Sequence, residues 1–258
     1  MSHILAENLT AEALFGLKGK VVLVTGGGTG IGLMMAKGLA VNGAKTYIGS
    51  RRKNVIESAA ESHGKGLAGR IIPIDLDVTS KESILNAVEV IRSENDGRLD
   101  VLINNAGQVG PKTLWFGDPS APQRKDAETL GRALFDHESF EDWQQLFSIN
   151  LASIYFVTTA FLGLLDKGSK VGGDWSASVV NITSISGSYK MAQNHFAYNA
   201  SKAAGDHLNV MLATEFAAKG LKIRGTYRRL SKRLVRSLME LYSECYRAGL
   251  IRDGNDRR

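Results

Sequence analysis

Residues 20–32, KVVLVTGGGTGIG, join a short apolar run to a glycine-rich turn and the start of a helical pattern. Lys20 to Thr25 is rich in β-branched residues, as a strand buried on both faces of a parallel sheet is. Residues 31–42 have helical apolar spacing and stop at Gly43. Glycines let the backbone approach a ligand closely, and a helix amino end offers free N–H groups to a pyrophosphate. A plain glycine-rich turn is the simpler alternative, but the strand–turn–helix context predicts dinucleotide binding by Gly26, Thr29, Gly30, Ile31 and Gly32.

Strands and helices alternate along the rest of the chain. Further strands are predicted over residues 45–50, 70–76, 99–104 and 178–183. Helical patterns separate them, at residues 54–62, 80–93, 140–165 and 196–219. This alternation predicts right-handed βαβ units and therefore a single α/β domain of the Rossmann type, with a doubly wound parallel sheet between two helical layers.

Composition excludes several classes of protein. With 258 residues, 43% hydrophobic and 22% charged, the chain has the composition of a globular protein with a sizeable core. The single cysteine, Cys245, cannot form an internal disulfide, and no apolar run approaches the roughly 20 residues that span a bilayer. The net charge is +6, but residues 225–258 hold nine basic and four acidic residues. The main domain is therefore nearly neutral, and we expect a cytoplasmic protein that binds neither nucleic acid nor membrane.

The end of the second strand carries basic side chains. In NAD-binding domains a carboxylate at this place accepts hydrogen bonds from the adenosine ribose. Here Ser50 is followed by Arg51 and Arg52. Guanidinium groups pair with a 2′-phosphate, which an acidic side chain would repel. A solvated basic helix start is the alternative, but the location favours NADP over NAD.

A third signal combines a hydroxyl-bearing strand end with a helical Tyr–Lys pair. Tyr198 and Lys202 are four residues apart, so they share one face of a helix. An ammonium beside a phenol favours the phenolate and lowers its pKa, which makes the tyrosine a usable acid or base near neutral pH. Ser184 ends the fifth strand, at the edge of a parallel sheet where ligands bind. Taken alone, each of these features is more often a surface pair or a turn residue.

Together these motifs resemble the short-chain dehydrogenase/reductase family, over about residues 17–224. The sequence is similar to fungal NADP-dependent members named after 3-oxoacyl-carrier-protein reductases. The motifs that carry the resemblance occur in the family's order: the turn at Thr25–Gly32, Asp77-Val78, Asn104-Asn105-Ala106-Gly107, Asn150, Ser184, and Tyr198 with Lys202.

The resemblance implies a role for each motif residue. Tyr198 would exchange a proton with the substrate oxygen, Lys202 would lower the Tyr198 pKa and hold the nicotinamide ribose, and Ser184 would orient the substrate. Ser186 competes for the serine role, because the gap from Ser184 to Tyr198 is one residue longer than expected. Asn150 would hold a water for proton relay. Contacts to the adenine, its ribose and the central strands would come from Asp77, Val78, Asn105, Ala106 and Gly107, and no metal site is predicted.

Two departures from the family pattern stand out. Residues 108–138 form a long irregular insertion that holds three of the four prolines, and it is either a flap over the substrate or a surface excursion. After Arg224 the family's Pro-Gly turn, substrate loop and last strand are missing. We therefore predict a domain over residues 1–224 that lacks the family's last strand, followed by a basic tail over residues 225–258.

The tail has several interpretations. Apolar residues from Leu230 to Ala248 recur at spacings of four and three, which predicts a helix with basic flanks. It could cover the sheet edge, be disordered, or arise from a retained intron, a frameshift or an alternative transcript. The abrupt break at Arg224 favours the last interpretation.

Two functions follow from the resemblance. The first is an NADP-dependent oxidoreductase that acts on a ketone or secondary alcohol, such as a 3-oxoacyl compound. The second is a truncated member of the family that binds nucleotide or a partner without turnover. The resemblance also implies a homo-oligomer paired through the helices at 140–165 and 196–219.

Overall fold

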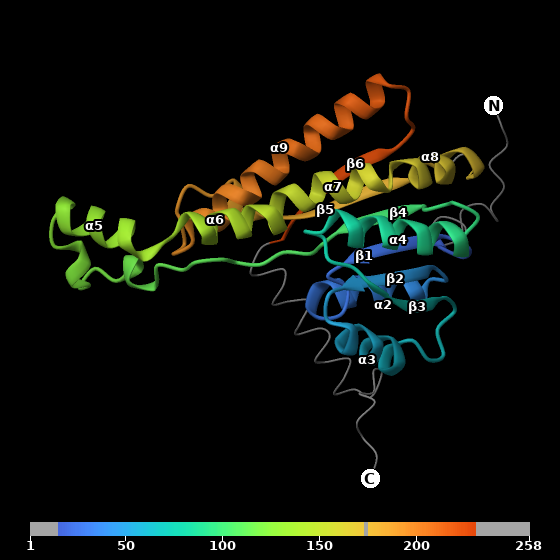
Figure 1. The fold of residues 1–258 in the computed structure, drawn as a ribbon, viewed down its shortest axis with the longest axis horizontal. Coiled ribbons are helices and arrows are strands. Elements are labelled where there is room, and N and C mark those ends of the chain that lie inside the picture. Colours follow the sequence, from blue (N-terminus) through green and yellow to red (C-terminus); the bar gives the residue numbers. More distant parts are fainter. Residues whose placement is uncertain (1–14, 173–174, 231–258) are drawn as a thin grey trace, which may run out of the picture.

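The computed structural model describes residues 15–172 and 175–230. Its six strands form one parallel sheet in the order β3-β2-β1-β4-β5-β6 (Figure 1). This order confirms the predicted doubly wound α/β fold. The strands are β1 (Val21–Thr25), β2 (Lys45–Ser50), β3 (Arg70–Asp75), β4 (Val101–Asn104), β5 (Ser178–Ser184) and β6 (Arg224–Leu230).

Helices cover both faces of the sheet. The helices are α2 (Gly30–Val41), α3 (Lys53–His63), α4 (Lys81–Glu94), α5 (Ala127–His137), α6 (Phe140–Phe147), α7 (Ser153–Ala160), α8 (Leu162–Val171) and α9 (Phe196–Ala218). Neighbouring residues of β1 face opposite sides, so that Leu23 packs with the buried residues of α4, α7 and α8, whereas Val22 packs with those of α2 and α3. Both β1 residues are fully buried.

The strand order reverses between β1 and β4. From β1 the chain builds outward through β2 and β3, then returns to place β4 on the other side of β1. The crossovers beyond the carboxyl ends of β1 and β4 therefore diverge and leave a crevice, which is where open α/β sheets bind ligands. Eight of the 17 predicted site residues follow these two strand ends, five after β1 and three after β4.

The helix predicted over residues 140–165 is wrong in one respect, because it is not continuous. A π-helical turn at Ser148–Ala152 separates α6 from α7, and the buried Phe161 separates α7 from α8 with a bend of 54°. A π turn inserts an extra residue into the helical repeat and often lies at a functional site. Among the described residues no single helix is long and apolar enough to cross a membrane, and the bent pair that is long enough contributes Val157 and Leu164 to the core.

The insertion at 108–138 is also more regular than expected. It holds two short 3₁₀ turns, Leu114–Gly117 and Pro122–Arg124, and the helix α5. The Asp126 side chain caps α5 by accepting from the Thr129 amide, a start signal that the nearby prolines obscured. Figure 1 shows α5 beyond the amino end of α9 and away from the sheet.

The start of the predicted tail belongs to the sheet. Residues 225–230 extend β6 and pair with β5 in register from Ser178 opposite Arg224 to Ser184 opposite Leu230. Leu230 was expected in the tail helix, and this is wrong because its backbone continues a strand. The remainder of the apolar stripe lies outside the described residues, so the tail helix beyond residue 230 and the absence of the family's last strand stay predictions.

Candidate active site

The glycine turn after β1 forms a tight cradle at the amino end of α2. Gly26 has a positive φ of 64°, and its amide donates to the Gly49 carbonyl (2.8 Å). A Cβ added to Gly32 would lie 2.3 Å from the Gly26 carbonyl oxygen, so only glycine lets the helix approach the turn this closely. The first helical bond runs from the Leu33 amide to the Thr29 carbonyl, which leaves the amides of residues 30–32 for an anion. The cradle fits a pyrophosphate.

Side chains after β1 and β4 lock the two strand ends together. The Thr25 hydroxyl accepts from the amides of Asn105 and Ala106 (3.0 Å each). The Asn105 side-chain amide donates to the carbonyls of Thr25 and Gly26. A Cβ added to Gly107 would lie 3.6 Å from Lys202 Nζ. The predicted Asn-Ala-Gly segment therefore runs from the cradle to the predicted catalytic lysine.

The predicted adenosine end lies between α2, β2 and the segment after β3. Arg52 donates to the Thr29 hydroxyl (3.4 Å), and its amide donates to the Ser50 hydroxyl (3.2 Å). The Arg51 guanidinium lies 3.9 Å from an Asp77 carboxylate oxygen, and the Arg51 side chain is 62% exposed. The structure thus places Arg51 beside Asp77 with most of its surface open to a further anion.

Asp77 remains ionised at neutral pH. Burial alone would raise the pKa of its carboxyl, but hydrogen bonds from the Thr79 hydroxyl and amide, together with the Arg51 charge, outweigh burial and lower that pKa. Val78 is partly buried against the core beside it. The predicted adenine contact is therefore a fixed carboxylate next to an apolar side chain.

Tyr198 and Lys202 occupy the first turns of α9, as the spacing predicted. Lys202 Nζ donates to the Ile182 carbonyl of β5 (2.9 Å) and lies 5.7 Å from the centre of the Tyr198 ring. The lysine is buried and Tyr198 is half-buried. Within the described part of the chain the Tyr198 hydroxyl makes no hydrogen bond. The phenol therefore lies beside a buried cation with its hydroxyl available to another molecule.

Asn150 lies in the π-helical turn and holds the loop after β4. Its side-chain oxygen accepts from the Gln108 amide, and its nitrogen donates to the Gln108 carbonyl (2.9 Å each). The same nitrogen lies 3.1 Å from the Ser201 hydroxyl of α9. These three partners were not predicted, because the contacts bridge residues 42 and 51 positions apart. The Asn150 side chain ties the β4 loop to α9 in this structure.

The two candidate serines differ in their surroundings. Ser184 ends β5, and its hydroxyl accepts from the Ser186 amide (3.1 Å). The Ser186 hydroxyl instead donates to the Gln193 side chain (2.8 Å), inside the loop before α9. Ser186 thus stabilises its own loop, whereas Ser184 stands at the ligand-binding edge of the sheet.

Sequence reasoning missed His195. This buried residue precedes α9, and its ring meets the Tyr198 ring edge-on at 5.1 Å between centres. Its Nδ1 lies 2.7 Å from the Asn199 side-chain oxygen. A histidine three residues before a tyrosine gives no recognisable signal in a single sequence. The structure makes His195 a direct neighbour of the predicted proton donor.

The proton-donor role predicted for Tyr198 should weaken as the pH rises through about 8. Burial lowers the pKa of the Lys202 ammonium from 10.5 to about 8, against an opposing contribution from Asp206. Loss of the proton removes the charge that favours the Tyr198 phenolate, so kcat/KM for a reaction that uses Tyr198 as proton donor should fall above that pH. The folded lysine binds fewer protons than the unfolded one between about pH 8 and 10.5, so its contribution to unfolding free energy rises across that window. A kcat/KM profile that stays flat through pH 10 would contradict this expectation.

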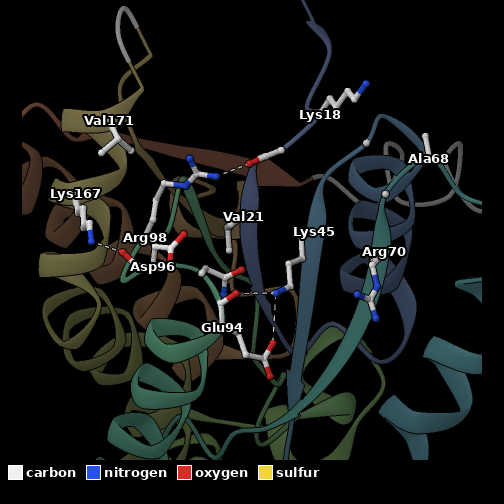
Figure 2. A pocket seen from close by; sticks show the side chains of 14 residues that line it. Lys18, Val21, Lys45, Ala68, Arg70, Glu94, Asp96, Arg98, Lys167 and Val171 are labelled. Carbon is white, nitrogen blue, oxygen red and sulfur yellow. Dashed lines mark hydrogen bonds and ion pairs between the residues drawn. The ribbon is translucent and has the colours of Figure 1, made fainter.

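A separate cavity of about 700 Å³ lies at the opposite edge of the sheet, where β1, β2 and β3 begin (Figure 2). Two of its cations bind neighbouring segments: Lys45 lies 3.4 Å from a Glu94 oxygen, and Arg98 donates to the Gly19 carbonyl (2.6 Å). None of the predicted site residues lines it. The candidate site is therefore the carboxyl edge of the sheet and not this cavity.

Comparison with known proteins assigns the same elements to one family. A family model described as short chain dehydrogenase matches residues 20–227. The chain is 38% identical over 217 residues to the short-chain dehydrogenase/reductase PhomF of Diaporthe leptostromiformis, covering 83% of this chain and 70% of that protein. It is 31% identical over 211 residues to the rhamnolipids biosynthesis 3-oxoacyl-[acyl-carrier-protein] reductase of Pseudomonas aeruginosa, covering 81% and 72% of the two chains. A solved structure, the Pseudomonas aeruginosa RhlG/NADP active-site complex, superposes with a TM-score of 0.65 at 27% identity, over 88% of this chain and 78% of that one.

Proposed function

The chain belongs to the short-chain dehydrogenase family, and on that premise we propose that it uses NADPH to reduce a ketone to a secondary alcohol. The family and the glycine cradle make the protein an oxidoreductase with a nicotinamide cofactor. The observation that carries the proposal is the placement of Tyr198 beside buried Lys202, at the sheet edge where the cradle lies. A 3-oxoacyl compound is one candidate ketone, since a relative carries that name.

Each side chain then has a defined task. The Tyr198 hydroxyl donates its proton to the ketone oxygen, and the Lys202 ammonium stabilises the phenolate that remains. The Ser184 hydroxyl hydrogen-bonds the same oxygen and orients the carbonyl. Asn150 fixes the β4 loop against α9, which holds Tyr198 in a fixed position relative to the glycine cradle. When bound, NADPH supplies the hydride to the carbonyl carbon.

The cofactor would be held by the residues predicted for it. The amides of Gly30, Ile31 and Gly32 would bind the pyrophosphate, and Asp77 and Val78 the adenine. Arg51, exposed beside Asp77, would pair with the 2′-phosphate. NADP is thus preferred to NAD because a cation, not a carboxylate, faces that position.

The alternative is a chain that binds nucleotide without turnover, because residues 225–258 lack the family's Pro-Gly turn and substrate loop. Loss of NADPH absorbance on addition of 2,3-butanedione or 1-phenyl-1,2-propanedione distinguishes the two. Oxidation of one NADPH for each diketone reduced supports the reductase. NADPH binding by thermal shift without any turnover of either diketone favours the alternative.

Cofactor preference should depend on Arg51. The variant Arg51→Ala should raise the Kd for NADPH about tenfold, because it removes a charge-assisted contact to the 2′-phosphate. The Kd for NADH, which lacks that phosphate, should stay unchanged. Fluorescence titration measures both values, with Arg92→Ala on α4 as an exposed-arginine control. Equal weakening of both cofactors would contradict the assigned role.

We also propose that two copies pair through α6, α7 and α9. A groove of about 630 Å³ runs between these helices and is lined by apolar side chains that include Phe147, Leu151 and Leu208. Tyr155 and Phe156 on its rim are 46% and 39% exposed. Exposed aromatic and aliphatic side chains gathered along one groove are typical of interaction sites, and a second copy would bury the same face.

The pairing depends on apolar contacts and should be sensitive to one buried charge. Met211 lines the groove and is 45% exposed in a single copy, so Met211→Arg would place an unpaired charge in the interface. Size-exclusion chromatography with light scattering should show a dimer or larger assembly for the natural chain and a monomer for the variant. Val210→Arg on the same helix, at a side chain 51% exposed and outside the groove lining, should leave the assembly intact. A natural chain that is already monomeric refutes the pairing.

A further inference from the structure

We propose that the first turn of the insertion, Thr113–Gly117, forms an aromatic wall of the substrate site and selects ketones that carry a flat apolar ring. The inference rests on the proposed reductase function and adds the class of substrate. If the insertion were only a surface excursion, this turn would make no contact with the catalytic elements. The structure instead docks it on the loop that leads into Tyr198.

The docking begins at Thr113. Its side chain is fully buried although the residue lies within the insertion. Its amide donates to the Asn194 carbonyl (2.9 Å), and its hydroxyl lies 3.5 Å from the same oxygen. Gly117 closes the other end of the turn, where an added Cβ would lie 3.1 Å from the Asn194 side-chain oxygen. Both ends of the turn therefore contact one residue, four positions before Tyr198.

Aromatic side chains extend this contact. The Phe116 ring meets the Phe196 ring edge-on at 5.2 Å, and the Trp115 ring meets Phe116 at 6.1 Å. Trp115 and Phe116 are half-buried, and Phe196 is 36% exposed. Edge-to-face rings at these distances attract one another. Because the three rings are only partly buried, part of their surface remains open to another ring. The turn thus presents a preformed aromatic surface at the amino end of α9.

The far end of the insertion braces this surface. His137, the last residue of α5, places its Nε2 3.0 Å from the Lys112 carbonyl, and its ring meets Trp115 edge-on at 6.3 Å. The last residue of α5 therefore contacts the beginning of the insertion, immediately before Thr113. A braced aromatic pair loses little freedom when a ligand ring packs on it, which favours binding.

The loop that receives the turn also carries apolar surface. Tyr189 and Met191 are 51% and 66% exposed, and Leu114 on the docked turn is 70% exposed. The same loop holds Gln193 and Asn194 at positive φ values of 55° and 65°. Such conformations are unfavourable for residues other than glycine and persist where surrounding contacts fix them, often at functional sites. Here the Ser186 and Thr113 contacts fix them.

Two diketones with the same reacting group test the wall. 2,3-Butanedione and 1-phenyl-1,2-propanedione each offer a vicinal diketone, and only the second carries a ring. Both react by hydride transfer from NADPH to one carbonyl carbon and proton transfer to its oxygen, which yields a hydroxyketone and NADP⁺. The variant Phe116→Ala should lower kcat/KM for the phenyl diketone about tenfold and leave that for butanedione unchanged. The calorimetric Kd of the phenyl diketone with the NADP⁺-bound protein should rise by the same factor.

The control is Phe135→Ala, a phenylalanine of the same insertion that is 75% exposed on α5 and lies outside the cluster. This variant should leave kcat/KM for both diketones unchanged. If Phe116→Ala fails to fold, Phe116→Leu keeps the apolar volume and removes the ring. An equal fall in kcat/KM for both diketones, or no fall for either, would contradict the proposed role of the turn in substrate selection. It would leave the proposed reductase function unaffected. A natural chain that reduces neither diketone overturns the proposed function and the wall together.

Discussion

Replacing Tyr198 with phenylalanine should lower kcat/KM for ketone reduction by about 10²–10⁴-fold, the usual contribution of a positioned proton donor. The substitution removes only the hydroxyl, which makes no hydrogen bond to the described part of the chain. The ring keeps its edge contact with His195. The melting temperature and the Kd for NADPH should therefore remain those of the natural chain, and steady-state kinetics with 1-phenyl-1,2-propanedione measure the loss.

A second tyrosine in the same region provides the control. Tyr189 lies on the loop before α9 and is 51% exposed, so Tyr189→Phe should retain nearly full activity. A Tyr198→Phe protein with undiminished kcat/KM would exclude Tyr198 as the proton donor. Loss of activity together with loss of folding would instead show that the hydroxyl is structural.

The substitution Gly32→Ala should abolish NADPH binding and destabilise the fold by about 1–3 kcal/mol, the usual cost of overpacking. Its Cβ would lie 2.3 Å from the Gly26 carbonyl oxygen and 2.5 Å from the Asn105 side-chain nitrogen. Neither neighbour is a flexible side-chain end, because the oxygen is backbone and the amide holds the end of β1. The start of α2 must therefore move away from the turn, which opens the cradle. Thermal unfolding with and without NADPH measures both effects.

A matching substitution at Gly38 of the same helix distinguishes the effect of this clash from the general effect of replacing a helical glycine with alanine. An added Cβ at Gly38 meets nothing within 4 Å. Gly38→Ala should therefore stabilise the protein by up to about 1 kcal/mol through helix propensity and keep the NADPH-induced shift. Intact cofactor binding in Gly32→Ala would show that the cradle is not where the pyrophosphate sits.

The order of strands and helices could be predicted because local signals agreed with the fold. Buried parallel strands read as continuous apolar runs, and the glycine turn marks the first crossover. The break of the 140–165 helix escaped prediction because a π turn leaves the apolar pattern almost unchanged. Strand β6 was not predicted, and its residues 225–230 were assigned to the tail because they include two arginines and little apolar sequence, whereas pairing with β5 decides their conformation.

For the candidate site, too, some features could be predicted from the sequence and others could not. Motif residues such as Tyr198 and Lys202 carry their chemistry in their spacing, so the sequence could place them. The contacts that hold them come from distant positions: Asn150 binds Gln108, and Thr113 binds Asn194 across 81 residues. No local pattern encodes such pairs, because they follow from the path of the chain between strands. For that reason the role of the insertion could not be chosen before the structure.

Transfer of deuterium from the cofactor to the substrate distinguishes a reductase from a protein that only binds the nucleotide. The purified chain is incubated with NADPH deuterated at the transferable position of nicotinamide C4 and with 1-phenyl-1,2-propanedione, and the product is analysed by mass spectrometry and NMR. We expect one deuterium on the new carbinol carbon for each NADP⁺ formed, and almost none with Tyr198→Phe. A protein that binds NADPH and yields no deuterated alcohol would contradict it and identify the chain as a nucleotide-binding protein without turnover.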